Sequence, residues 1–382
     1  MTISKAHAVA ADFVFDGMSL RRDCAVIVEG SQIRDLIPAR NLPPELPQVR
    51  LKRGAWLAPG FIDVQVNGGG DVLFNDQPTV EGISRIVAAH RRSGTTSLLP
   101  TLITDKDEKM LAARNAVASA MANEPGVLGI HFEGPFLSPD KAGVHEPQLI
   151  RTPEPHHQEL LTSLEAGVTV VTLAPERVPR ATVRALAKEG VRVSLGHSMA
   201  TYAETVAALE DGLTGFTHLF NAMRPMSARE PGPIVAALES SAWYGLIVDG
   251  HHVAPPMLKL VLKGEGHPML VTDAMPPVNG ARADFELFGR KIEVKDGRCL
   301  TKDGRLAGSA IDMATAVKNC VRLLGVPLID ALRLASLSPA RFLGVDDKVG
   351  RFAGGLRADM IALEPGEVHV TDVWVAGRHW PS

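Results

Sequence analysis

Eight short apolar runs alternate with segments of helical periodicity between about residues 60 and 275, and this alternation constrains the fold most strongly. In chain order the runs are FIDVQVN, TTSLLPT, GVLGIHFEG, GVTVVTLAPE, VRVSLGHS, GFTHLFN, YGLIVDGHH and MLVTDA. Strands joined by helices run parallel, because a helical crossover returns the chain to the same end of the sheet. Eight such units predict an α/β fold, a (β/α)8 TIM barrel. A doubly wound open sheet is the alternative, but Gly68-Gly69-Gly70 lacks the GxGxxG spacing that would favour it.

The two ends of the chain have a different pattern. Residues 1–58 and 350–382 contain alternating apolar and polar segments with turns between them and no helical periodicity. Neither end is long enough to bury a core alone. We therefore expect one small β-sandwich domain built from both ends, beside a barrel over residues 59–349. Within this barrel we expect a β-hairpin insertion near residues 276–311, and then helices over 312–325 and 327–344.

Composition excludes several classes of protein. The 40 basic and 43 acidic residues give a formal net charge of −3, and no basic block stands out, so nucleic-acid binding is not expected. The three cysteines form no CxxC pair, which argues against a disulfide scaffold and a thiolate zinc site. No apolar run approaches the ~18 residues of a membrane span. We expect a cytoplasmic protein that acts on a soluble small molecule.

Polar residues suited to catalysis or metal binding lie where most of the eight runs end. In a barrel the carboxyl ends of the strands converge on one mouth. The residues concerned are Gln65, Asn67, Glu133, His197, His218, Asp249, His251, His252 and Asp273. Each alone has an ordinary explanation, such as a helix cap or a satisfied buried histidine. Together they form a cluster that is costly to bury unless a cation neutralises it.

The donors in this set are typical of a hydrolytic metal site. Two neutral imidazoles and one carboxylate suit Zn²⁺ or Fe²⁺, with manganese or cobalt as alternatives. Three protein ligands leave one coordination position open, and a divalent ion can lower the pKa of a water there to about 7. Asp273 is then the natural general base and later general acid. His252 would polarise a substrate carbonyl.

These residues lie in motifs that resemble the amidohydrolase superfamily, and within it the deacetylases of phosphorylated amino sugars. The motifs are PGFIDVQVNG, HFEGPF, KAGVHEP, LGHSMAT, THLFNAM, REPG, DGHHV, VTDAM, LAGS and GGLRADMIAL. They run almost from end to end of the chain. The resemblance implies hydrolysis of the acetamide of N-acetyl-D-glucosamine 6-phosphate to D-glucosamine 6-phosphate and acetate, in amino-sugar catabolism or cell-wall recycling.

The same resemblance implies roles for individual residues. Glu133, His197 and His218 would bind the metal, and Asp273 and His252 would be catalytic. The residues expected at the substrate are Gln65, Ala142, His145, Asn221, Ala222, Arg229, Asp249, Gly250, His251, His252, Leu306, Ala307 and Gly308. Arg229 would bind the 6-phosphate in the active site of the neighbouring subunit of a homodimer. Of the two adjacent histidines, the DGxH register selects His252 for the substrate.

One departure from the wider superfamily concerns the number of metal ions. Many two-metal members carry His-x-His at the end of the first strand, where this chain has Gln65-x-Asn67. The fourth run also lacks a lysine that could be carbamylated. Side-chain amides offer only a carbonyl oxygen and are weaker ligands than imidazole. We therefore predict one divalent ion per subunit.

Three other functions are compatible with parts of this pattern. A deacetylase of N-acetylgalactosamine 6-phosphate would use the same motifs. A cyclic-amide hydrolase or a deaminase would explain the histidines and the aspartate, but not REPG or KAGVH. A barrel that has lost catalysis and serves as a binding module would be expected to lack some of the ligand positions, and all of them are present.

Overall fold

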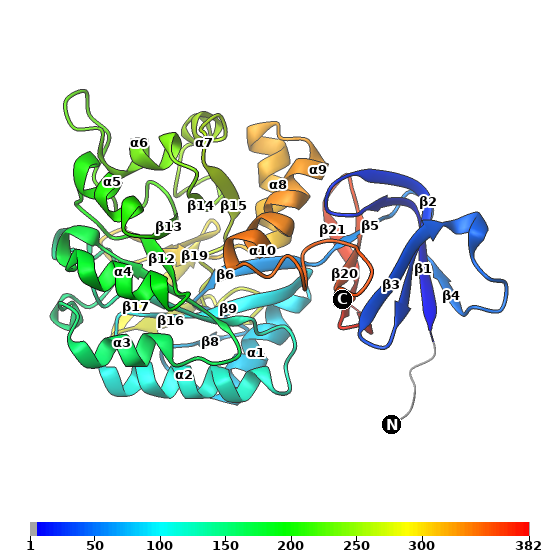
Figure 1. Cartoon of the computed structure of the whole chain (residues 1–382), viewed down its shortest axis with the longest axis horizontal. Coiled ribbons are helices and arrows are strands. Elements are labelled where there is room, and N and C mark those ends of the chain that lie inside the picture. Colours follow the sequence, from blue (N-terminus) through cyan, green and yellow to red (C-terminus); the bar gives the residue numbers. More distant parts are fainter. Residues whose placement is uncertain (1–5, 382) are drawn as a thin grey trace.

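The computed structural model describes residues 6–381, and a parallel eight-stranded sheet forms the centre of its larger part (Figure 1). In chain order its strands are β6 (Phe61–Val66), β9 (Thr95–Ile103), β10 (Gly129–Glu133), β11 (Val168–Leu173), β12 (Arg192–Leu195), β13 (Leu213–Phe216), β14 (Trp243–Leu246) and β15 (His267–Leu270). Each strand pairs with the next along the chain. The barrel closes where Val66, the last residue of β6, forms a parallel bridge with Ala274 in the segment that follows β15. The predicted TIM barrel is confirmed.

Helices surround this barrel because the strands are apolar on both faces. All residues of β6, β9 and β10 are buried, as expected for parallel strands covered on each side. The helices are α1 (Val80–Arg91), α2 (Asp107–Met121), α3 (Pro155–Thr162), α4 (Arg180–Lys188), α5 (Tyr202–Glu210), α6 (Gly232–Glu239), α7 (Pro255–Val261), α8 (Met313–Leu324), α9 (Leu328–Leu334) and α10 (Leu337–Leu343). None of the helices within residues 6–381 has the length and hydropathy to cross a bilayer.

The last expected helix, over 327–344, is divided in two. Ser336, between α9 and α10, has φ −131° and ψ −76°, which is not helical. Pro339 lies in the first turn of α10, where its missing N–H costs nothing. In a continuous helix the same proline ring would clash with the carbonyl of Ala335. The prediction of one uninterrupted helix was therefore wrong.

The two ends of the chain form a second sheet beside the barrel (Figure 1). Its strands are β1 (His7–Phe15), β2 (Leu20–Glu29), β3 (Gln32–Pro38), β4 (Gln48–Arg50), β5 (Trp56–Pro59), β20 (Met360–Glu364), β21 (His369–Val375) and β22 (Arg378–Pro381). The N-terminal strand β5 pairs with both β1 and the C-terminal strand β20, so the strands expected in a sandwich join in one hydrogen-bonded sheet. This sheet has its own apolar core, which includes Val26, Leu57 and Trp374. The domain boundaries at residues 58 and 350 stay a prediction.

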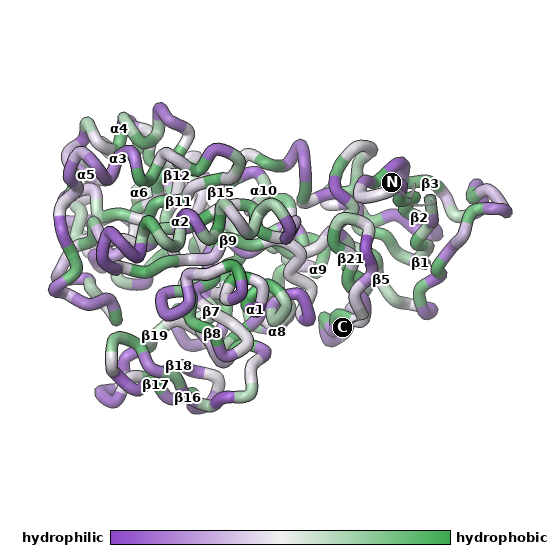
Figure 2. Tube along the Cα trace, turned by 90° about the horizontal axis from the view of Figure 1, so that it is seen from below, coloured by the Kyte–Doolittle hydropathy of each residue, from purple (hydrophilic) through white to green (hydrophobic). Residues whose placement is uncertain are grey.

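The expected insertion is a four-stranded sheet that Figure 2 shows below the barrel. It consists of β16 (Asp284–Leu287), β17 (Arg290–Lys295), β18 (Arg298–Leu300) and β19 (Leu306–Ser309). The backbone N–H of Ser309 donates to the carbonyl of Asp273 at 2.9 Å, and that of Met275 to the carbonyl of Ser309 at 3.0 Å. The insertion is thus joined to the segment that follows the eighth strand.

A buried carboxyl group links the first strand to the same segment. Asp63 in β6 is fully buried, and its side chain accepts hydrogen bonds from the hydroxyl of Thr272 and the backbone N–H of Gln65. Burial raises the pKa of Asp63 to about 7. In the unfolded chain an aspartate has a pKa of about 3.9. Between these values the folded protein holds a proton that the unfolded chain has lost.

This difference predicts a pH dependence of stability. The contribution of Asp63 to stability is complete below pH ~4 and is lost as the pH rises through about 7. Between pH 5 and 8.5 we expect the free energy of unfolding to fall by about 3 kcal/mol through this group, and Asp63→Asn should abolish that fall. Denaturant unfolding at the two pH values measures the effect. The exposed control Asp347→Asn should behave as the wild type; an undiminished fall in Asp63→Asn would contradict the assignment.

Candidate active site

Three side chains from the carboxyl ends of three strands converge on one point. Glu133 is the last residue of β10, and His197 and His218 each lie two residues beyond β12 and β13. Oε1 of Glu133 lies 3.1 Å from Nε2 of His197 and 2.9 Å from Nε2 of His218. The two imidazole nitrogens are 3.2 Å apart, and all three side chains are buried. The structure therefore brings together the three residues expected to bind a metal.

The backbone at the strand ends is held in an uncommon conformation. His197, His218 and Asp273 have φ values of +48°, +31° and +52°. Residues other than glycine adopt this left-handed region at a cost that the surrounding structure must offset. Such conformations cluster at functional sites.

The chemistry of the donors fits a cation. Nδ1 of His197 lies 2.8 Å from the carbonyl oxygen of Lys141 and must donate to it, so Nε2 of this ring faces the cluster with its lone pair. Burial would raise the pKa of Glu133, but the imidazoles of His197 and His218 hold it well below its ordinary value. Burial would lower the pKa of His218, but Glu133 raises it. Positive charge is favoured at this point, as a divalent ion would provide.

A second carboxylate lies beside this cluster. Asp273 follows β15 by three residues, and its Oδ1 accepts hydrogen bonds from Nδ2 of Asn67 at 2.6 Å and Nε2 of Gln65 at 3.2 Å. The same Gln65 nitrogen is 3.3 Å from Oε2 of Glu133. Burial, reinforced by the charge of Glu133, raises the pKa of Asp273 to about 6. Gln65 thus connects the two carboxylates, and both amides donate to Oδ1 of Asp273.

The structure separates the two adjacent histidines. Nδ1 of His252 lies 2.6 Å from Oδ2 of Asp249, and the His252 side chain lines the same cavity as Asp273. His251 is exposed and does not line that cavity. The histidine selected by the DGxH register is therefore the one at the cavity.

A cavity of about 310 Å³ contains this group of residues. Of the residues expected in the site, those that line it are Glu133, His145, His197, His218, Asn221, Ala222, His252, Asp273, Leu306 and Gly308. Gln65 reaches the site through its bonds to Glu133 and Asp273. The remaining expected residues, which do not line the cavity, are Ala142, Arg229, Asp249, Gly250, His251 and Ala307.

Several lining residues were not predicted. They are Ile103, Asp140, Lys141, Gly143, Val144 and Met275. Val144 and His145 line the cavity together, whereas Ala142 is buried outside it. The conformation of this loop, which includes Gly143 at φ +61°, decides which of its residues face inward. Asn67, which was expected at the barrel mouth, also lines the cavity, but its bond to Asp273 was not predicted.

His145 presents a hydrogen-bond donor to the cavity. Its Nδ1 accepts from the backbone N–H of Thr104 at 3.3 Å and lies 2.7 Å from the hydroxyl of the same residue. Burial lowers the pKa of His145 to about 3, so the ring is neutral. The proton of a neutral ring with Nδ1 as acceptor lies on Nε2, which suits a sugar hydroxyl oxygen.

A second group of possible metal donors has a structural role. Asp107, His156 and His157 lie close together at the start of α3. Nδ1 of His157 accepts from the backbone N–H of Glu154, so its Nε2 must donate to Asp107 at 3.1 Å. Arg151 also pairs with Asp107. The carboxylate is thus already neutralised, and the group caps the helix.

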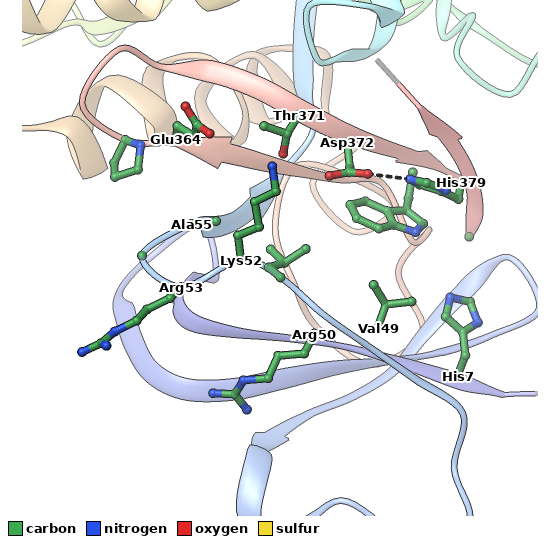
Figure 3. A pocket seen from close by; sticks show the side chains of 15 residues that line it. His7, Val49, Arg50, Lys52, Arg53, Ala55, Glu364, Thr371, Asp372 and His379 are labelled. Carbon is green, nitrogen blue, oxygen red and sulfur yellow. Dashed lines mark hydrogen bonds and ion pairs between the residues drawn. The ribbon is translucent and has the colours of Figure 1, made fainter.

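A larger cavity, of about 850 Å³, lies at the terminal sheet (Figure 3). Some of its charged residues form ion pairs. Arg50 binds Asp12 at 3.1 Å and Asp23 at 3.0 Å, and the figure shows His379 against Asp372, at 2.9 Å. None of its lining residues belongs to a group of possible metal donors among residues 6–381. The candidate active site is therefore the smaller cavity at the barrel mouth.

Comparison with known proteins identifies the family. A model of the Amidohydrolase family matches residues 56–379. The chain belongs to the amidohydrolase family. The expected membership is confirmed, and with it a metal-dependent hydrolase on a TIM barrel.

Several amidohydrolases resemble the whole chain. An N-acetylgalactosamine-6-phosphate deacetylase of Shewanella sp. (strain ANA-3) is 43% identical over 337 residues, covering 87% of this chain and 84% of that relative. An N-acetylglucosamine-6-phosphate deacetylase of Haemophilus influenzae is 37% identical over 365 residues, covering 94% and 95%. A crystal structure of N-acetylglucosamine-6-phosphate deacetylase from Pasteurella multocida superposes with a TM-score of 0.95 at 34% identity, covering 99% of this chain and 100% of that one.

Proposed function

We propose that this amidohydrolase hydrolyses the acetamide of N-acetyl-D-glucosamine 6-phosphate to D-glucosamine 6-phosphate and acetate. The observation that carries the proposal is the convergence of Glu133, His197 and His218 beside Asp273 in one cavity. The likeness to the Haemophilus and Pasteurella enzymes, over nearly all of each chain, supports the substrate class.

Glu133, His197 and His218 would hold one divalent ion, for which zinc is the first candidate. When bound, such an ion supplies Lewis acidity and lowers the pKa of water towards neutrality. The amides of Gln65 and Asn67 are engaged with the carboxylates, which supports one ion rather than two.

The side chains of the cavity would carry the proton transfers. Asp273 accepts the proton of the attacking water, and Oδ2 takes it because Oδ1 already accepts from two amides. The same carboxyl then gives the proton to the leaving nitrogen, since the free amine is a better leaving group than its anion. His252 donates a hydrogen bond to the acetamide oxygen as negative charge develops there. His145, with Nε2–H as donor, binds a sugar hydroxyl.

The direct test is product analysis on the purified protein together with elemental analysis. Acetate release from N-acetylglucosamine 6-phosphate, with one divalent ion per chain, is the expected result. N-acetylgalactosamine 6-phosphate is assayed in parallel because the Shewanella relative bears that name; preference for it would redirect the proposal to the other sugar. Ammonia release from nucleobases without acetate release would overturn it.

Arg229 is proposed to bind the 6-phosphate across a homodimer. Its side chain is exposed and does not line the cavity of its own chain, whereas a guanidinium is well suited to a phosphate. Arg229→Ala is expected to raise KM for the phosphorylated sugar at least about tenfold, while leaving turnover of unphosphorylated N-acetylglucosamine unchanged. Arg53→Ala, an exposed arginine at the terminal sheet, is the control.

Co-expression tests whether the arginine acts between subunits. A heterodimer of Arg229→Ala and Asp273→Asn chains has one site with an intact aspartate that receives an intact arginine from its partner. We expect this mixed dimer to regain low-KM activity that neither parent has. Equal loss of activity on both sugars, or no recovery in the mixed dimer, would remove Arg229 from this role.

A further inference from the structure

We propose that Asp249 is a positioning residue that acts through His252 and does not itself contact the substrate. The inference rests on the function proposed for His252. Sequence motifs place both residues at the substrate, but only His252 lines the cavity. Asp249 is instead turned towards its own segment of backbone.

Both oxygens of Asp249 are occupied within the turn that it begins. Oδ1 accepts the backbone N–H groups of His251 at 2.8 Å and His252 at 2.9 Å, and Oδ2 accepts from Nδ1 of His252 at 2.6 Å. The side chain of Asp249 is 1% exposed. Burial would raise the pKa of Asp249, but the bonds from His252 and the two N–H groups hold it below its ordinary value. The carboxylate is thus ionised, and its burial outside the cavity keeps it from the substrate.

This arrangement determines what His252 can offer. Because a carboxylate has no proton to donate, Nδ1 of His252 carries one, and Nε2 is the ring nitrogen left for the cavity. A hydrogen bond from Nε2 to the acetamide oxygen requires a proton on that nitrogen too, and the buried carboxylate of Asp249 lies against the positive charge that this proton adds. His252 then donates a charged hydrogen bond to the acetamide oxygen, and no proton leaves the ring during the addition step. Such a bond strengthens as the oxygen becomes negative.

Asp249→Asn tests this with little change of shape. The amide oxygen can keep both backbone N–H bonds, while the NH2 group replaces Oδ2 and donates to Nδ1 of His252. The variant therefore reverses the tautomer of the ring and removes the compensating charge. We expect kcat to fall about a hundredfold or more, with KM changed less than about twofold, because the lost interaction belongs to the transition state.

A double-mutant cycle separates action through His252 from direct contact. The double variant Asp249→Asn/His252→Gln should be no slower than His252→Gln alone, since no imidazole remains to be positioned. Multiplying effects, or a large rise in KM in Asp249→Asn, would show direct substrate binding and overturn the inference. Metal content and the thermal midpoint of each variant identify any misfolded protein.

Asp16→Asn is a matched control. Asp16 is a buried aspartate of the terminal sheet whose Oδ1 also accepts two backbone N–H groups, from Met18 at 2.9 Å and Ser19 at 2.8 Å. It should lose stability without any change in kcat or KM. A wild-type protein that releases no acetate would refute the proposed function, whereas an active wild type with an equally active Asp249→Asn would refute only this inference.

Discussion

Asp273→Asn is expected to retain its metal and its affinity for substrate and to lose about a thousandfold in kcat. The amide oxygen of the new side chain can still accept the bonds from Asn67 and Gln65, which lie 2.6 and 3.2 Å from Oδ1. The group that replaces Oδ2 is an NH2, which cannot accept the proton of water. Geometry is therefore preserved while the proton transfer is lost.

Initial rates of acetate release give kcat and KM, and elemental analysis gives the metal content of the same preparation. Asp16→Asn, which removes a buried carboxylate remote from the barrel mouth, controls for general effects of the substitution. A kcat within tenfold of the wild type would assign the proton transfer to another group. Loss of metal would mean that the variant reports on binding of the ion and not on proton transfer.

Glu133→Gln is expected to weaken metal binding by at least about a hundredfold and to abolish activity at equimolar metal. The carboxylate of Glu133 contacts both His197 and His218, and an amide in its place offers only a neutral carbonyl oxygen. The wild type, stripped with a chelator, should recover full activity with one equivalent of Zn²⁺ per chain. The variant should not.

The second group of acidic and imidazole side chains provides the control for this result. Asp107→Asn removes the carboxylate that His156 and His157 contact, and should leave metal stoichiometry unchanged. Two tightly held ions in the wild type, or one ion retained in Glu133→Gln, would contradict the assignment of a single site.

The barrel could be predicted because each of its strands and helices is indicated by a pattern within a short stretch of sequence. The strands of a parallel sheet are buried on both faces, so each appears as a continuous apolar run, and helical connections force the runs to be parallel. The exact ends of the strands were harder to predict from the sequence. β13 ends at Phe216 and β14 at Leu246, which leaves His218 and Asp249 in the connections beyond them. Hydrogen bonds between strands end where the backbone turns, and apolar periodicity does not record that point.

The candidate site was predictable where residue type carries the chemistry. Glu133, His197, His218 and Asp273 were expected to meet because strand ends of a barrel share one mouth, and they do. Not all of the substrate residues taken from motifs line the cavity. Ala142 and Ala307 lie outside the cavity while Val144 and Lys141 line it, because loop conformation decides which side chains of consecutive residues face inward.

The amino-acid sequence by itself determined the succession of strands and helices and the kinds of donor available at their ends, since both follow from the order of apolar and polar side chains. Only the tertiary structure decided how these donors are connected. It showed that Asn67 donates a hydrogen bond to Asp273, and that Asp249 binds His252 instead of facing the cavity. The physical reason is that these two hydrogen bonds, each 2.6 Å long, form only when the backbone adopts left-handed turns and when the fold brings together residues as many as 206 positions apart.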